Sequence, residues 1–255
     1  MNKDRFRIGK VHISRTNSSD TQKKISEAVL NVDGGYICVT NMRMVRYAGN
    51  TPEYALLMEN SFMNLPDGKP LTWCGKLWGL NDVECTNGPE LFAAMLAKGD
   101  NGLKHYLLGD TQDVLDAILA KNNKEMKASI VGAESLPFAD VDKFDYEGIA
   151  NRVEKSGANI VWTAMRAPKQ DYFNKKLYEY LPNVVLIGVG RAFRLLIGEV
   201  KDAPKWAHKM GIAGLFTRKV SLLKALEFYF VTSFYLIAYV IKIIWRKLIG
   251  VKCYE

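Results

Sequence analysis

The stretch HYLLGDTQDVLDAILAK at residues 105–121 decides the fold class, because two kinds of apolar pattern meet within it. His105–Leu108 is a short apolar run, as buried parallel strands tend to be. Thr111–Lys121 carries apolar residues at helical spacing, and Asp110 stands where a helix N-cap is expected. The stretch therefore predicts a buried strand that leads directly into a helix.

The same order recurs along the first 217 residues. The other expected strands are Tyr36–Thr40, Ser129–Val131, Asn159–Thr163 and Val184–Val189. The other expected helices are Pro52–Glu59, preceded by Thr51; Pro89–Lys98; Tyr146–Lys155, capped by Asp145; and Lys169–Tyr180. This alternation predicts a Rossmann-like α/β layered fold with a mainly parallel sheet, in which ligands bind at the carboxyl ends of the strands.

The composition is that of a folded protein with a basic surface. Of the 255 residues, 48% are hydrophobic and 24% are charged. These values exclude an intrinsically disordered chain, a collagen-like fibre and a disulfide mini-protein. The net charge of +8 indicates an anionic partner, such as nucleic acid, an anionic membrane or a phosphorylated substrate.

Cysteine and histidine usage indicates the compartment more than the chemistry. The four cysteines and three histidines show no metal-ligand spacing, so we expect no structural zinc site. The amino-terminal MNKDRFRIGK is charged and has no apolar run behind it, so we expect no signal peptide. Together these features predict a reducing, cytoplasmic setting.

The last part of the chain differs in character from the rest. Residues 218–255 hold seven basic and two acidic residues, a net charge of +5, beside the apolar stretch ALEFYFVTSFYLIAYVIKIIW. Its uncharged run, Phe228–Ile241, has 14 residues and falls short of the roughly 20 that cross a bilayer. We therefore divide the chain into an α/β domain at residues 1–217 and a membrane-associating helical tail at residues 218–255.

Three placements of this tail are open. Its polar residues fall mostly on one side of a helical wheel, which suits a helix lying in the membrane interface. The alternatives are a helix that spans the membrane and one that packs on the domain or on a second subunit. Because the positive charge lies beside an apolar helix and not on a basic face with aromatic residues, nucleic-acid binding is disfavoured.

Two loops carry residues that could perform chemistry. In LPDGKP, which we expect to follow a helical segment, Asp67 is either an ordinary residue of a tight turn or a carboxylate held at a cleft as a general base. In RAPKQD, Arg166 and Lys169 could add charge to a phosphate site at a helix N-terminus, or be ordinary solvated residues.

A third loop, Gly188–Phe193, is glycine-rich. It has two glycines of a dinucleotide fingerprint but lacks the third, so that assignment is weak. We expect its glycines to allow close approach of the backbone to a ligand or a neighbouring helix.

Seven short motifs follow one another between residues 10 and 215. They are V-T-N around Thr40 and Asn41, L-P-D-G at Leu65–Gly68, V-x-x-T-x-G-P-E-L-F at Val83–Phe92, L-L-G-D at Leu107–Asp110, A-P-K-Q-D at Ala167–Asp171, I-G-V-G-x-A-F at Ile187–Phe193 and A-P-K-W at Ala203–Trp206. In this order they resemble the WecG/TagA/CpsF family of bacterial glycosyltransferases, glycosyltransferase family 26.

The resemblance implies an enzyme of cell-surface polysaccharide synthesis, such as teichoic acid linkers, common antigen, capsule or exopolysaccharide. It implies inverting transfer of an N-acetylmannosamine-type or related hexose from a UDP-sugar to an undecaprenyl-diphosphate-linked sugar. It further implies a peripheral protein at the cytoplasmic face of the plasma membrane, held there by the carboxyl-terminal appendage, with a homo-oligomer possible. A non-catalytic scaffold of a polysaccharide assembly complex is the alternative function.

The resemblance also implies roles for particular residues. Asp67 corresponds to the family's general base, and Gln170 to a substrate contact. Substrate binding is also expected at Thr40, Asn41, Lys169, Arg166, Gly190 and Gly109. We expect no cofactor and no metal, because helix N-termini and basic residues can stabilise a diphosphate leaving group. The D-x-D spacing at Asp140–Asp142 is interpreted as a capping or loop pair.

The chain departs from the family pattern at several places. Arg166 stands where Gly is usual, Asp171 replaces a Glu, and Arg194 replaces an Asp that often follows V-G-x-A-F. The R-A-P motif becomes Asp202-Ala-Pro, and G-L-E-W-x-x-R becomes the segment 211–217. The appendage arginines that handle diphosphate are thus shifted or absent, and Arg218, Lys219 or Lys205 could replace them.

Overall fold

The computed structural model describes residues 4–99, 102–204, 206–207, 210–213, 216 and 222–253, with the backbone alone for residues 222–229. His208 and the three candidate diphosphate contacts Lys205, Arg218 and Lys219 lie outside the described residues.

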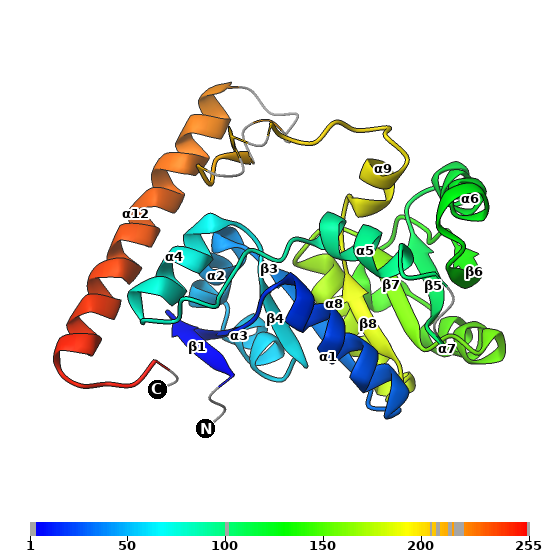
Figure 1. Ribbon diagram of the computed structural model, residues 1–255, viewed down its shortest axis with the longest axis horizontal. Coiled ribbons are helices and arrows are strands. Elements are labelled where there is room, and N and C mark those ends of the chain that lie inside the picture. Colours follow the sequence, from blue (N-terminus) through cyan, green and yellow to red (C-terminus); the bar gives the residue numbers. More distant parts are fainter. Residues whose placement is uncertain are drawn as a thin grey trace.

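Six strands form one parallel sheet in the order β4-β3-β8-β7-β5-β6 (Figure 1). They are β3 (Gly35–Thr40), β4 (Met63–Pro66), β5 (Lys104–Gly109), β6 (Ser129–Glu134), β7 (Ile160–Ala164) and β8 (Val185–Gly188). Every neighbouring pair is parallel, so the loops that follow the strands gather at one edge of the sheet. The predicted α/β class and parallel sheet are confirmed.

Helices cover both faces of this sheet, each through its own hydrophobic cluster. One face carries α2 (Met42–Asn50), α3 (Pro52–Glu59), α4 (Lys69–Leu77), α7 (Tyr146–Ser156) and α8 (Lys169–Tyr180). The other carries α1 (Ser18–Leu30), α5 (Gly88–Leu96), α6 (Gln112–Lys121) and α9 (Ala192–Leu196). A hairpin of β1 (Arg5–Ile8) and β2 (Val11–Ser14) packs beside β4 and α4.

One expectation about this region was wrong. Leu65 and Pro66 do not follow a helix but end strand β4, whose residues are MNLP. The strand is not recognisable from its sequence, because Pro and Asn are both depleted in sheets. Asn64 is nevertheless fully buried, and its Nδ2 donates to the backbone oxygens of His12 and Met58, each at 2.8 Å. These bonds satisfy the amide inside the core.

The long helix α12 (Leu222–Leu248) runs along one side of the domain and packs on α2 and α4 (Figure 1). Ile243 is buried against the domain, and the Arg46 guanidinium lies 5.2 Å from the ring centre of Tyr235. The ring of Tyr239 covers the β1–β2 turn so closely that a Cβ at Gly9 would lie 2.7 Å from its Cε1. One face of the tail therefore packs on the domain, as one of the three alternatives predicted.

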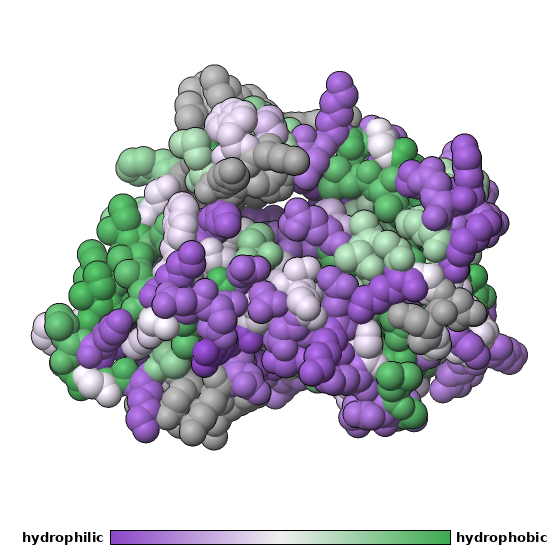
Figure 2. Space-filling view, in the orientation of Figure 1, coloured by the Kyte–Doolittle hydropathy of each residue, from purple (hydrophilic) through white to green (hydrophobic). Residues whose placement is uncertain are grey.

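The opposite face of α12 is apolar and uncovered. Its exposed side chains recur every three or four residues, at Phe230, Phe234, Ile237, Ile241, Trp245 and Leu248. They form the band of hydrophobic surface where α12 runs in Figure 2. None of the helices within the described ranges combines the length and apolarity that crossing a bilayer requires.

Candidate functional site

The carboxyl ends of β3 and β8 meet at a topological switch point, and we call the place just outside these two strand ends the crevice. These strands are neighbours, yet β3 continues into α2 on one face of the sheet and β8 continues towards α9 on the other. Ligands of open α/β sheets bind where neighbouring strands diverge in this way. The predicted site residues Thr40, Asn41 and Gly190 stand at this crevice.

Asp67 stands directly beside it, on a loop tied down at three points. The register pairs Thr40 with Pro66, and the Asp67 amide donates to the Thr40 oxygen at 2.7 Å. The Thr86 amide donates to the Pro66 oxygen at 2.9 Å, and the Gly68 amide donates to Cys85 Sγ at 3.1 Å. The backbone that carries the Asp67 carboxylate is therefore fixed.

Glycine is required at the next position of this loop. Gly68 has φ +100° and ψ 151°, a conformation that side chains with a Cβ rarely adopt. It also immediately precedes α4, whose first turn contains Lys69 and Pro70. The turn chemistry read from P-D-G is thus present, and it places Asp67 between the end of a strand and the start of a helix.

Thr40 and Asn41 lie in the crevice, but part of their polar capacity is already used. Thr40 is 1% exposed and its hydroxyl donates to the Cys38 oxygen at 3.4 Å. Asn41 is the N-cap of α2, and its Oδ1 accepts from the amides of Arg43 and Met44 at 3.1 and 3.3 Å. The side-chain NH₂ of Asn41 remains as a donor for a ligand.

Gln170 reaches the same crevice from the first turn of α8. A Cβ at Gly188 would lie 2.8 Å from Cδ and Nε2 of Gln170, so only glycine lets this side chain lie against the end of β8. A Cβ at Gly190, where φ is +58°, would lie 3.8 Å from Gln170 Oε1. Gly188 thus makes room for Gln170, whereas at Gly190 it is the positive φ that favours glycine.

The Gln170 side chain is also unsatisfied. Gln170 is 3% exposed, and its buried Oε1 has no hydrogen-bond partner within the described part of the chain. A buried amide oxygen without a partner costs about 1–3 kcal/mol, so such groups commonly mark a place that a ligand or water completes.

Two of the predicted substrate-binding residues, Lys169 and Gly109, lie elsewhere along this edge of the sheet. Lys169 Nζ donates to the Ala139 oxygen and lies 5.2 Å from the ring centres of Phe138 and Phe144. It therefore contacts the segment after β6 and not the Asp67 loop. Gly109 ends β5 with φ +96°, and a Cβ there would lie 3.2 Å from the Ala164 oxygen, so this glycine serves close strand packing.

A comparison with known families adds to this geometry. The model of the Glycosyl transferase WecG/TagA/CpsF family matches residues 6–248, nearly the whole chain. The chain belongs to this family. It is therefore a glycosyltransferase, and the family's work in cell-surface polysaccharide synthesis gives its general setting.

The family departure at Arg194 has a structural counterpart in this glycosyltransferase. Asp110 does not cap α6 as predicted, because α6 begins one residue later, with Thr111 as the N-cap. The Asp110 carboxylate instead accepts from Arg194 Nε at 3.0 Å and Nη2 at 2.6 Å. The pair joins the loop after β5 to the helix after β8, 84 residues apart.

The predicted cap of α7 by Asp145 is confirmed, because its carboxylate accepts from the Gly148 amide at 2.9 Å.

Several residues of this region were not predicted as site residues. Thr86 lies within the quoted V-x-x-T-x-G-P-E-L-F motif, is 2% exposed, and its buried Oγ1 has no partner among the described residues. Gly88 of the same motif lies against the end of β8, since a Cβ there would be 3.2 Å from the Val189 oxygen. Their place in this motif was the sequence signal that could have identified both as site residues.

The most unusual carboxyl group near the site is Asp171, next to Gln170. It is 2% exposed and accepts a hydrogen bond of 2.5 Å from the Tyr54 hydroxyl. Burial raises the pKa of Asp171 to about 7, although Tyr54, Arg43 and Cys38 all act to lower it. The carboxyl group therefore takes up a proton within the physiological pH range.

This ionisation predicts a pH dependence of stability. Because the pKa of Asp171 is raised in the folded state, its contribution to stability is fully present below the unfolded-state pKa of 3.8 and is lost as the pH rises from there through about 7. Asp171→Asn should remove that decline, which amounts to a few kcal/mol. Urea unfolding at several pH values between 4.5 and 8 measures it, and a variant whose pH slope equals that of the wild type would contradict the assignment.

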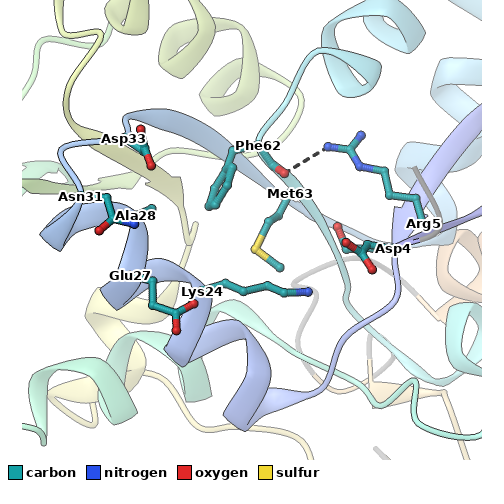
Figure 3. A pocket seen from close by; sticks show the side chains of 10 residues that line it. Asp4, Arg5, Lys24, Glu27, Ala28, Asn31, Asp33, Phe62 and Met63 are labelled. Carbon is teal, nitrogen blue, oxygen red and sulfur yellow. Dashed lines mark hydrogen bonds between the residues drawn. The ribbon is translucent and has the colours of Figure 1, made fainter. Parts of the chain in front are cut away.

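A pocket of about 300 Å³ lies at the opposite edge of the sheet, where β3 and β4 begin (Figure 3). The guanidinium of Arg5 stands at this pocket and donates to the backbone oxygens of Phe62 and Glu59 at 3.1 and 3.2 Å. These bonds hold the β1–β2 hairpin against the segment before β4. We assign this pocket no part in the transfer reaction.

Proposed function

We propose that this protein transfers a sugar from a UDP-sugar to a polyprenyl-diphosphate-linked sugar with inversion of configuration. An N-acetylmannosamine-type or related hexose is the donor sugar, and undecaprenyl diphosphate carries the acceptor. The single observation that supports this best is the placement of two groups around the end of β3: Asp67 on a fixed turn after β4, and a buried and unsatisfied Gln170 against the end of β8. Family membership supports the reaction type.

In this proposal Asp67 is the general base. The acceptor hydroxyl oxygen attacks the anomeric carbon of the donor sugar, and the Asp67 carboxylate takes the hydroxyl proton as the new bond forms. The bond from the anomeric carbon to the UDP oxygen breaks, and its electron pair leaves with UDP. A single displacement of this kind inverts the anomeric centre.

Gln170 has a positioning task in the same reaction. Its amide is buried and lies against Gly188, so its side-chain freedom is limited before a substrate arrives. A held amide offers both donors and an acceptor to sugar hydroxyls or to the leaving group, and it loses little entropy on binding.

We further propose that the enzyme works as a peripheral protein at the cytoplasmic face of the plasma membrane. The uncovered apolar face of α12 supports this, because an exposed stripe of aromatic and aliphatic side chains of this kind suits the headgroup boundary of a bilayer. Lys242 is exposed on the same helix, and Arg246 lies one turn further on, which suits anionic lipids.

Acceptor-dependent release of UDP tests the proposal. Purified protein is incubated with a panel of UDP-sugars, with and without a short-chain lipid-diphosphate-sugar acceptor. The expected result is UDP release with at least one donor only when the acceptor is present. Release without acceptor would indicate a hydrolase. No release with any donor, from protein whose folding is verified by circular dichroism, would favour the scaffold alternative.

Metal independence stays a prediction in this assay. Turnover should be unchanged by EDTA, and loss of turnover that manganese restores would contradict it.

A further inference from the structure

Two arginines stand at the crevice with no role in the proposal so far. Arg43 lies in the first turn of α2, three residues after Thr40, and Arg166 lies in the loop that follows β7. The Nη2 group of Arg43 donates to the Ala167 oxygen at 2.9 Å. The guanidinium of Arg43 is therefore anchored on the loop that carries Arg166.

Their charges repel each other. Burial lowers the pKa of Arg43, and the nearby Arg166 lowers it further. Two cations are held close together only when the fold or a bound anion offsets their repulsion. Residues that act to raise the pKa of Arg43 are Tyr54 and Asp171, so one carboxyl group faces it.

That carboxyl group does not neutralise the pair. Asp171 is buried, already accepts from Tyr54, and has a pKa raised to about 7, so it is only partly ionised near neutral pH. Arg166 is exposed, and its side chain makes no hydrogen bond or ion pair among the described residues, whereas its backbone oxygen accepts from the Gln170 amide at 3.3 Å. Arg43 and Arg166 therefore carry more positive charge than Asp171 neutralises.

Hydrogen-bonding capacity is also left unused here. The Nε group of Arg43 is buried and has no acceptor within the described residues. Gln170, on the helix that the same loop begins, is 3% exposed and has its unpartnered Oε1 at the end of β8. Two unsatisfied buried groups and an unpaired guanidinium around one loop indicate a site that a multiply charged ligand completes.

We propose that Arg43 and Arg166 bind the diphosphate group of a substrate in this crevice. The assignment rests on the proposed function and deepens it, because it names two guanidinium groups of the α/β domain that would bind the negatively charged diphosphate. A diphosphate offers several anionic oxygens, and each guanidinium can donate two parallel hydrogen bonds to them. Arg166 stands where the family usually has Gly, so in this chain it adds a positive charge at the phosphate site.

The diphosphate belongs either to the nucleotide donor or to the lipid-linked acceptor, and binding measurements distinguish the two. Calorimetry is carried out with uridine, UMP, UDP, inorganic diphosphate and a short-chain polyprenyl diphosphate. The proteins are the wild type, Arg166→Gln, Arg43→Met and Arg152→Gln. Arg152 of α7 is a matched control that lies away from the crevice. Its Nε and Nη2 groups donate to the Glu134 carboxylate at 2.9 and 2.7 Å.

We expect Arg166→Gln to weaken diphosphate binding about 10-fold or more, as loss of a charge-assisted hydrogen bond should. Uridine binding and binding by Arg152→Gln should stay unchanged. A loss for UDP assigns the pair to the donor, and a loss for the lipid diphosphate alone assigns it to the acceptor. Either result supports the site.

Equal diphosphate affinities of the wild type and folded Arg166→Gln would overturn the proposal. So would a loss that is as large for uridine as for UDP, because it would show a deformed pocket. Arg166 is exposed, so its variant should fold even if Arg43→Met does not. Arginine-dependent binding of inorganic diphosphate without any sugar transfer would leave this site standing and sink the proposed function, so the two failures are distinguishable.

Discussion

Asp67→Asn should lower kcat by about 10²–10⁴-fold, the usual contribution of a general base. The amide has nearly the same shape as the carboxylate but cannot take the proton of the acceptor hydroxyl. The loop should keep its conformation, because the bonds that fix it come from the backbone amides of Asp67, Gly68 and Thr86. Binding of the UDP-sugar should therefore change little.

Steady-state UDP release measures this loss, and calorimetry with UDP measures the retained binding. Asp33→Asn is the matched control, because Asp33 is an exposed loop carboxylate at the opposite edge of the sheet, just before β3. It should keep full activity. A folded Asp67→Asn protein with wild-type kcat would remove Asp67 as the base while leaving the transferase activity intact.

Much of this fold could be predicted, because its central units are local. The strand at His105–Leu108 and its helix at Thr111–Lys121 appear as β5 and α6 within one or two residues. Pro52–Glu59 and Lys169–Tyr180 match α3 and α8 in full. Their signals, an apolar run and a capped or proline-started helix, act over a few residues and are visible in any single sequence.

One element that was not expected, strand β4, depends on long-range contacts. Its sequence has poor strand propensity, but it pairs with β3, and its buried Asn64 bonds to the hairpin residue His12, 52 positions earlier. The amphipathic tail was expected to be helical, but which of its faces packs on the domain depends on the position of α2 and α4. Gly9 against Tyr239 could not be inferred from spacing.

The site shows the same division. Asp67 and Gln170 could be named from their motifs, whereas their common place depends on β3 and β8 being neighbours, about 150 residues apart in the chain. Arg43 carries no motif signal, and only the bond to the Ala167 oxygen, 124 positions away, places it at the crevice. Likewise, Asp110 is a good helix cap by local rules, but Arg194 binds its carboxylate.

Replacing the outer face of α12 should release the protein from membranes. Phe234, Ile241 and Trp245 are 66%, 62% and 64% exposed, so most of each side chain is available to the headgroup boundary. Burying such side chains contributes about 1–2 kcal/mol each when the burial is partial. Changing all three to Ser should therefore weaken vesicle binding by about 10²–10⁴-fold.

Co-sedimentation with vesicles that contain anionic lipid measures the loss. A variant with Leu30, Val32 and Leu56 changed to Ser is the matched control, because these side chains are 68%, 60% and 62% exposed on other helices and loops. It should bind as the wild type does. Binding of the wild type should weaken as salt is raised, since part of the attraction comes from basic residues such as Lys242.

The outcome also decides what covers the apolar face. If the wild type does not sediment with vesicles, the membrane assignment is wrong, and light scattering then shows whether a second copy covers the face. An oligomer that the triple variant converts to a monomer would establish that alternative. If the variant loses vesicle binding but keeps transfer to a water-soluble acceptor analogue, α12 brings the enzyme to its lipid substrate without taking part in the chemistry. Loss of both would mean that α12, through its contacts with α2 and α4, also holds Asn41 and Asp67 in place.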